Sequence, residues 1–529
     1  MSCCDKKSCE MMAMSLKEVA KAVGGDLRVS NGTDVNSLVA TSACSDSREA
    51  HEGSVFVAIA GEHVDGHDYV EKAANLGAVV ALVEHKVKLS DGVSIAQIIV
   101  DDSVKSLGLL AKHNLERRRA ADDPFTIVGI TGSVGKTTTK DMLHDLLSTV
   151  GSTVAPVGSF NNEIGLPLTA LHVNSHTRFL VAEMGANHVG EIAGLTRIAP
   201  PDIAVVLKVG VAHLGEFGSV DRIAQAKSEI VRGLVPHGIA VLNADDMRVS
   251  NMSHLVDDGN VRWFGRELID TGLLPVPENS YQIFASDITL DDFGLPVCKI
   301  TVHNESGKTE SASLHLALHG EHNIMNALAA ANVAYYCGMS LEKIVEVLSK
   351  VSHISPHRMQ FSKVSANNRS FTLIDDSFNA NPDSMKAGID GLCAFEHSKD
   401  SSSSDSNSLF RIAVLGSMLE LGGDEYLLHN NIGEYVAQHN VDAVIAVGST
   451  DSNELDCLAE CIANGARKAW NNKILTANDA IFFVHSDSQA NDIVWDLVDK
   501  HPDSVVLLKG SHASGLSALA ERWAKLMSC

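Results

Sequence analysis

Aromatic residues, proline and positive charge are all scarce in this chain of 529 residues. Phe, Trp and Tyr make up 5% of it, and aromatic residues are nowhere interleaved with basic ones. The 42 Lys and Arg are outnumbered by 66 Asp and Glu. The resulting formal net charge of -24 argues against nucleic acid as a partner, because nucleic acid requires a basic patch. An anionic nucleotide is still acceptable, since a local loop can hold it against the overall field.

Long apolar runs and metal-type cysteine spacings are also missing. No stretch is long and apolar enough to cross a bilayer, so we expect no membrane insertion. The N-terminus lacks the apolar run of a signal peptide, and the ten cysteines show no paired metal spacing. Cys3, Cys4 and Cys9 could bind a metal, but a disordered tail explains this cluster better. We therefore expect a reducing compartment, the cytoplasm, and a monomer.

The remaining composition, 45% hydrophobic and 20% charged, is typical of a globular protein with an ample core, and the length suggests about three domains. We predict an α/β protein in which a disordered tail (1–13) precedes a small α/β domain (14–120). A central domain (121–354) would contain a phosphate loop and a doubly wound, mostly parallel sheet. A C-terminal domain (355–529) would be Rossmann-like.

Hydrophobic periodicity and turn residues predict the elements of each domain. In the first we expect helices at 15–23 and 69–76, strands at 54–60 and 78–83, and a charged linker at 117–124. In the second we expect strands at 125–130, 180–183, 203–209 and 239–246, helices at 140–147, 223–231 and 319–332, and an antiparallel β segment over 255–315. In the third we expect strands at 371–376, 410–416, 441–448 and 503–510, and a flexible Ser-rich insertion at 398–408.

A glycine-rich turn joins the strand at 125–130 to the helix that follows it. Such a turn aims backbone N–H groups and a helix N-terminus at a phosphate. Its spacing, Gly-x-x-Gly-Lys-Thr, is shorter than the usual loop, because Ile130 stands where the first Gly would be. We expect Lys136 to reach the terminal phosphates of a nucleotide, and Thr137 or Thr138 to place a hydroxyl on Mg²⁺. The predicted nucleotide-binding residues of this turn are Thr131, Gly132, Ser133, Gly135, Lys136, Thr137 and Thr138.

Other polar residues follow the predicted strands or lie on nearby helices. Glu183 ends a strand, where a carboxylate could hold Mg²⁺ opposite the phosphate loop, although a carboxylate that starts a helix gives the same pattern. His213 follows the next strand, and its place on the same rim favours a metal role over the structural role usual for a lone His. From the residues alone, Lys227 is best interpreted as an ordinary solvated helix lysine. Asn323 and Asn326 begin a helix, either as caps or as partners of a base edge.

Eight segments in this order resemble the Mur ligases of cell-wall precursor synthesis, over residues 15–517. They are the phosphate loop at 132–138, Phe160–Pro167, Glu183–His188, Ala212–Leu214, the helix with Lys227, Gly320–Asn323, Pro356–Arg358 and Asp375–Pro382. The greatest similarity is to the member that joins D-alanyl-D-alanine to UDP-N-acetylmuramoyl-tripeptide. The resemblance implies an ATP-dependent amide ligase of peptidoglycan precursor synthesis. ATP would phosphorylate the carboxylate of the UDP-linked peptide, and the dipeptide amine would attack the acyl phosphate.

The resemblance also implies roles for the residues singled out above. Lys136 would contact the terminal phosphates, and Thr137 and Glu183 would share one Mg²⁺. His213 would help to hold a second Mg²⁺. In the family, the lysine that matches Lys227 is carbamylated, and this modification would turn a cation into a carboxylate able to bind Mg²⁺. The implied catalytic residues are therefore Lys136, His213 and Lys227.

The resemblance implies substrate contacts from all three domains. Asn323 matches an adenine-contacting position. Arg358 and Asp376 match residues that meet ATP phosphate and ribose once the third domain closes onto the second. The implied substrate-binding residues are Ser47 and Arg48 for the UDP end, Asn161 and Asn162 for the sugar-peptide portion, and Asn379 and Asn381.

Two departures from the family pattern bear on the amino substrate: Ser417 stands where Asp is usual, and His512 stands where Arg is frequent. Two other functions are alternatives to the ligase activity that the resemblance implies. One is another ATP-dependent amide ligase of the same design, such as a different Mur ligase or a folylpolyglutamate synthetase. The other is a nucleotide-binding interaction protein that has lost catalysis. The intact Lys136, Glu183, His213 and Lys227 speak against the second alternative.

Overall fold

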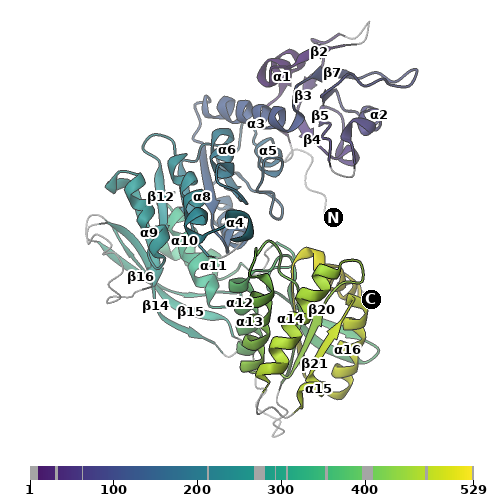
Figure 1. Cartoon of the computed structure of the whole chain (residues 1–529). Helices are drawn as coiled ribbons and strands as arrows, with labels where there is room; N and C mark the ends of the chain where they lie inside the picture. Colours follow the sequence, from purple (N-terminus) through teal and green to yellow (C-terminus); the bar gives the residue numbers. More distant parts are fainter. Residues whose placement is uncertain are drawn as a thin grey trace.

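The structure is a computed structural model with several sheets of mixed α/β type, drawn in Figure 1. It describes residues 10–29, 34–61, 64–210, 214–266, 280–291, 294–304, 308–351, 355–395, 409–470 and 475–526. Among the predictions made above, those for His213, the Ser-rich insertion and most of the N-terminal tail fall outside these residues. No helix in the described part of the chain is long and apolar enough to cross a membrane.

The N-terminal unit has a five-stranded sheet in the order β2-β7-β6-β5-β4, and β1 pairs with β3 beside it. Ser15 caps the first helix by accepting a hydrogen bond from Glu18 N, and Gly24 ends it in a left-handed conformation, which confirms the helix expected at 15–23. The helices are α1 (Leu16–Val23), α2 (Val70–Asn75) and α3 (Ser103–Arg119), and the strands are β1 (Met14–Ser15), β2 (Asp26–Arg28), β3 (Val39–Ala40), β4 (Ser42–Cys44), β5 (Ser54–Val57), β6 (Val80–Val83) and β7 (Ala96–Ile99).

Helix α3 corrects the expectation of a charged linker at 117–124. Arg118 is buried, and its guanidinium donates to the carbonyls of Thr177, Asp123 and Pro124. Arg119 forms an ion pair with Asp202 at 2.8 Å. The apolar face of α3 belongs to a core that runs from the first helix into the central unit. The arginines therefore fasten α3 to the central unit, because a guanidinium with several carbonyl acceptors can be buried at acceptable cost.

The central unit contains a nine-stranded sheet in the order β16-β15-β14-β13-β12-β11-β8-β10-β9. The strands from β9 to β14 are parallel in this sheet, which confirms the predicted parallel strands. The segment 255–315 is only partly antiparallel: its first two strands continue the parallel sheet, and the antiparallel pairs are β14-β15 and β15-β16. The strands are β8 (Thr126–Thr131), β9 (Thr153–Val154), β10 (Phe179–Glu183), β11 (Ile203–Val206), β12 (Ile239–Asn243), β13 (Val261–Arg266), β14 (Tyr281–Leu290), β15 (Pro296–His303) and β16 (Thr309–His315).

Helices cover both faces of this sheet, as the doubly wound arrangement requires. One core lies between the sheet and α4, α10 and α11, and the core shared with α3 lies on the other face. The helices are α4 (Lys136–Ser148), α5 (Gly165–Ala170), α6 (Glu191–Ile198), α7 (Leu214–Phe217), α8 (Val220–Arg232), α9 (Met247–Ser250), α10 (His322–Tyr336) and α11 (Leu341–Leu348).

The C-terminal unit contains a six-stranded sheet in the order β17-β18-β22-β19-β20-β21, in which only β17 runs antiparallel to its neighbour. Figure 1 shows this unit beside the central one, with the sheet of the N-terminal unit on the side of α3 that faces away from the central unit. The domain boundaries at 120 and 354 stay predictions. The strands are β17 (Gln360–Ala366), β18 (Arg369–Asp376), β19 (Phe410–Gly416), β20 (Ala443–Val447), β21 (Ile481–Val484) and β22 (Ser504–Lys509), and the helices are α12 (Pro382–Ala394), α13 (Glu425–Gln438), α14 (Asn453–Ala469), α15 (Ala477–Ala480), α16 (Asp487–Lys500) and α17 (Leu516–Leu526).

Candidate active site

The glycine-rich turn links the end of β8 to the start of α4, so the first turn of this helix carries Lys136, Thr137 and Thr138. Gly135 precedes the helix with φ 84°, a conformation that favours glycine, and a Cβ there would lie 2.3 Å from Asn326 Oδ1. The helix begins four residues earlier than the periodicity predicted. Because the first N–H groups of a helix have no partner within it, this start leaves them available to an anion.

Lys136 is held over this turn. Its Nζ donates to Gly132 O at 2.8 Å, and its side chain lines a cavity beside the helix. Burial lowers the pKa of Lys136, the negative charge of Glu183 raises it, and the positive charge of Arg358 lowers it further. Lys136 and Arg358 thus place two cations at the same cavity, and this favours the binding of an anion with several charges.

Glu183 is the last residue of β10 and is fully buried next to the first turn of α4. Thr137 Oγ1 donates to its Oε2 at 3.0 Å, and Asn161 Nδ2 donates to its Oε1 at 2.8 Å. The next helix begins only at Glu191, so the alternative that Glu183 is a helix-start carboxylate is wrong. The structure thus brings a carboxylate and a hydroxyl together beside the phosphate turn.

Lys227 lies in the middle of α8 and is 2% exposed, so the interpretation of a solvated helix lysine is wrong. Its Nζ lies 5.7 Å from the centre of the Phe217 ring. Burial and the positive charge of Lys136 lower the pKa of Lys227 to about 7, although Glu191 and Glu229 act in the opposite direction. Among the described residues, no carboxylate forms an ion pair with this amine within 4.0 Å. In a large fraction of the molecules, the Lys227 amine is therefore uncharged near neutral pH.

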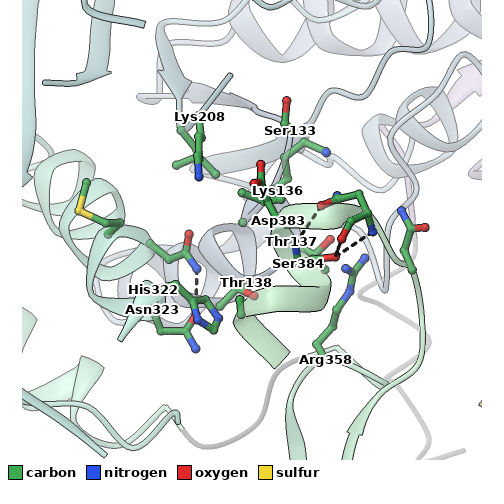
Figure 2. Close-up of a pocket in the computed structure, with 18 of the residues that line it drawn as sticks. Ser133, Lys136, Thr137, Thr138, Lys208, His322, Asn323, Arg358, Asp383 and Ser384 are labelled. Carbon is green, nitrogen blue, oxygen red and sulfur yellow. Dashed lines mark hydrogen bonds between the residues drawn. The ribbon is translucent and has the colours of Figure 1, made fainter. Parts of the chain in front are cut away.

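One cavity of about 520 Å³ lies between the central and C-terminal units. Figure 2 shows Asn323 and His322 on one side of the first turn of α4 and Arg358 on the other. Arg358 comes from the C-terminal unit, and its Nη2 donates to Ser159 Oγ, in the central unit, at 3.2 Å. The predicted site residues that line this cavity are Ser133, Gly135, Lys136, Thr137, Thr138, Asn161, Glu183, Asn323, Arg358, Asp376, Asn379 and Asn381.

Some of the predicted residues already have partners within the fold. Asp376 forms an ion pair with Lys509 at 2.7 Å. Asn323 donates to His319 O and accepts from Asn326. Asn381 is the N-cap of α12, so its side-chain oxygen is occupied by a backbone N–H of that helix. A ligand would meet the remaining donors and acceptors of these side chains.

Other predicted residues lie outside the cavity. Thr131 is buried and donates to Met184 O at 2.8 Å, and Asn162 Oδ1 accepts from Gly165 N at 2.9 Å. Gly132 contributes the carbonyl to which Lys136 donates. In the N-terminal unit, Ser47 is buried, while Arg48 is exposed and paired with Asp46. The predicted substrate-binding and nucleotide-binding roles of residues outside the cavity stay predictions, as does the role of Lys227, which also does not line it.

Several lining residues were missed by the sequence reasoning. Lys509, the last residue of β22, is buried against Asp376, and Lys208 follows β11 with its carbonyl accepting from Ser133 N at 2.8 Å. Both lie at the carboxyl ends of buried strands, and this was the signal that could have found them, because the carboxyl ends of parallel strands form the binding edge of such sheets. Asn243 and Arg266, which end β12 and β13, line the cavity and carry the same signal. His322 and Asp383 also line it but lie in the first turns of α10 and α12.

No cluster of three or more His, Cys, Asp or Glu that could hold a metal occurs within the described ranges. A site built from Glu183 and the Thr137 hydroxyl, and completed by phosphate oxygens and water, would not need such a cluster. Of the two departures, Ser417 is buried and His512 is exposed, and neither lines the cavity.

Comparison with known proteins gives consistent results over nearly the whole chain. Three family descriptions match: "Mur ligase family, catalytic domain" over 42–115, "Mur ligase middle domain" over 130–334, and "Mur ligase, glutamate ligase domain" over 357–512. The UDP-N-acetylmuramoyl-tripeptide--D-alanyl-D-alanine ligase of Mycobacterium tuberculosis is 35% identical over 531 residues, which cover 97% of this chain and 98% of that protein.

Solved structures show the same relationship. MurF from Acinetobacter baumannii superposes with a TM-score of 0.76 at 28% identity, covering 98% of this chain and all of that one. MurF ligase from Thermotoga maritima, solved in complex with ADP, has a TM-score of 0.70 at 27% identity and covers 92% of this chain and 97% of its own.

Proposed function

The chain belongs to the Mur ligase family and is a ligase, and we propose that it joins D-alanyl-D-alanine to UDP-N-acetylmuramoyl-tripeptide at the expense of ATP. One observation carries the proposal. The turn before α4, the buried Glu183 and Arg358 of the C-terminal unit all line one cavity, as a reaction between a triphosphate and a carboxylate requires. The product would be a precursor of peptidoglycan.

The chain's own residues suit the first step, transfer of a phosphoryl group from ATP to the peptide carboxylate. Lys136 and the free N–H groups at the start of α4 would bind the terminal phosphates, and Arg358 would approach them from the opposite side. The carboxylate oxygen attacks the terminal phosphorus, ADP leaves, and an acyl phosphate forms. Fixed cations stabilise the charge that develops on the transferred group.

In the second step, the amine of D-alanyl-D-alanine attacks the acyl carbonyl. The amine loses a proton, phosphate leaves from the tetrahedral intermediate, and an amide bond remains. The same cations that hold the phosphoryl group also stabilise the departing phosphate. Asn323 would contact adenine, while Asp376 would meet the ribose from the C-terminal unit.

Mg²⁺ fits the oxygen donors beside the turn. Glu183 is a fully buried carboxylate whose described partners are a hydroxyl and an amide, and hard oxygen ligands of this kind are those that Mg²⁺ prefers. We propose that Glu183 and Thr137 hold the ion, which would neutralise charge on the phosphate oxygens when bound. The role of His213 at a second ion stays a prediction.

Lys227 fits the proposed carbamylation. A buried amine with a pKa of about 7 is partly neutral at physiological pH, and only the neutral amine can add to CO₂. Addition with loss of one proton would give a carbamate, an oxygen ligand in place of a cation. We further propose that Ser47, Arg48, Asn161 and Asn162 serve the UDP-linked substrate and that Asn379 and Asn381 face the amino substrate. A cytoplasmic monomer also remains our expectation.

Mixing the purified protein with ATP, Mg²⁺ and the two substrates tests the proposal. Phosphate release that needs both the UDP-linked tripeptide and D-alanyl-D-alanine, with one pentapeptide product by mass spectrometry, is the expected result. Turnover with a different amino substrate would assign another amide ligase of the family. ATP binding without turnover on any acceptor would identify a protein that has lost catalysis.

A further inference from the structure

The loop that follows β19 (417–423) contacts the central unit at helix α7. Gly215 N of this helix donates to Glu420 O at 3.1 Å. A Cβ on Gly215 would lie 2.5 Å from Gly422 N and 2.8 Å from Gly422 Cα. Because both partners are backbone atoms, no change of rotamer could relieve that overlap. Any side chain at Gly215 would therefore force the two units apart at this point.

This loop is held firmly within the C-terminal unit. Met418 N donates to His429 Nε2 at 2.8 Å, and His429 Nδ1 lies 2.7 Å from the carbonyl of the residue four positions earlier. His429 is fully buried, and burial lowers its pKa, which favours the neutral ring with its proton on Nδ1. The loop thus presents Glu420 and Gly422 to α7 as a fixed surface.

The next two residues of α7 contact side chains that lie near the candidate active site. Phe217, the last residue of this helix, is buried, and its ring lies next to Lys227 Nζ. Glu216 forms an ion pair through its Oε2 with His188 Nε2 at 3.2 Å, and His188 lies in the loop that follows β10 and Glu183. Three consecutive residues, 215 to 217, therefore connect the C-terminal loop with Lys227 and with the loop that follows Glu183.

We propose that α7 is a positioning element of the ligase. When the C-terminal unit closes the cavity, the loop after β19 seats against Gly215 and thereby fixes Phe217 over Lys227. Gly215 and Gly422 are positioning residues, because neither lines the cavity. The inference rests on the proposed function, since it concerns the assembly of that site.

The test compares Gly215→Ala with Gly423→Ala in the full-length chain. Both glycines have ordinary negative φ, but a Cβ on Gly423 meets nothing within 4 Å, so this variant is a matched control in the partner loop. We expect kcat of Gly215→Ala to fall at least tenfold, because the overlap penalises only the closed arrangement. Its affinity for the UDP-linked tripeptide, measured without ATP, should stay within about twofold, and the control should keep the kcat of the parent.

The opposite results would overturn the proposal. Alanine forms helices better than glycine, so a role confined to α7 itself would leave Gly215→Ala as stable and as active as the parent. Full activity of this variant therefore refutes the positioning role. Absence of ATP-dependent ligation in the parent would instead refute the proposed function.

Hydrogen exchange on the unmodified chain provides a measurement that does not depend on a variant or on turnover. With ADP and the UDP-linked tripeptide bound, the Gly215 amide should exchange at least about tenfold more slowly than in the free protein, because its bond to Glu420 O forms on closure. Equal exchange in the two states overturns the inference, including in the case where Gly215→Ala does not fold.

Discussion

Replacement of Lys227 by methionine should stabilise the protein and abolish its ligase activity. The amine is buried, and its pKa is lowered to about 7 from 10.5 by burial and by the nearby Lys136. Methionine has a similar length and no charge, so it removes the cost of keeping this amine away from water. The parent and the variant should be compared in CO₂-free buffer, so that the amine stays unmodified.

The size of the effect follows from the two pKa values, which differ by 10.5 − 7 = 3.5. Each unit of pKa difference corresponds to about 1.4 kcal/mol, so burying the Lys227 amine costs ~5 kcal/mol of unfolding free energy below pH 7, where the amine is charged in both the folded and the unfolded chain. Between pH 7 and 10.5 the amine is protonated in the unfolded chain but neutral in the folded one. The cost of burying it therefore declines as the pH rises through this range and vanishes above it. About 4 kcal/mol remains at pH 7. The buried Phe217 ring, 5.7 Å away, offsets ~1–2 kcal/mol of this.

Differential scanning calorimetry between pH 6 and 10.5 measures this difference. For a unit of about 150–250 residues, 1 kcal/mol corresponds to roughly 2–4 °C in Tm, and the shift is smaller for a larger cooperative unit. The transition that includes the central sheet should therefore rise by about 5 °C at pH 7. The two proteins should converge by pH 10.5. Lys112→Met, which removes a lysine 44% exposed on α3, should shift Tm by less than about 2 °C. A variant that melts below the parent at pH 7, or a gain that persists at pH 10.5, would refute the reasoning.

Three further outcomes test other parts of the site. Lys136→Met should lower kcat by about 10²–10³ without lowering Tm, because its amine is also kept from water, and near-normal turnover would contradict its contact with the phosphates. Glu183→Gln should raise the Mg²⁺ concentration for half-maximal activity at least about tenfold, and an unchanged titration would exclude this carboxylate as a ligand. Asp376→Ala should lower the unfolding free energy of the C-terminal unit by ~3 kcal/mol in a urea titration, because it leaves the buried Lys509 amine without its carboxylate. Equal stability would show that the pair contributes nothing.

The sequence was most informative where chemistry and local structure depend on neighbouring residues. The phosphate turn was predictable because strand, glycines and Lys136 are contiguous, and the helix cap at Ser15 follows from one hydroxyl before an apolar pattern. The start of α4 was misplaced because Lys136, Thr137 and Thr138 carry no apolar periodicity, although their backbone is helical.

Burial of polar side chains was less predictable, because distant segments decide it. Lys227 occupies a helix position that its sequence neighbours suggest is exposed, yet its side chain is buried, with the ring of Phe217 5.7 Å from the amine. Lys509 and Asp376 form their ion pair across 133 positions of the chain. Arg118 finds its carbonyl partner Thr177 59 positions away. No local sequence pattern predicts such pairs, since they form only when sheets and helices assemble.

The apolar face of α3 has one consequence for how this chain can be divided. Leu107, Leu110 and Leu115 share an uninterrupted core with α5 and α6 of the central unit, and Arg118 is sealed into the same junction. A fragment that starts at Phe125 lacks α3, so the apolar faces of α5 and α6 would be exposed to water and the fragment would tend to aggregate. A truncated protein should therefore keep the N-terminal and central units together and be cut before the C-terminal unit. The two joined units should unfold in one cooperative transition.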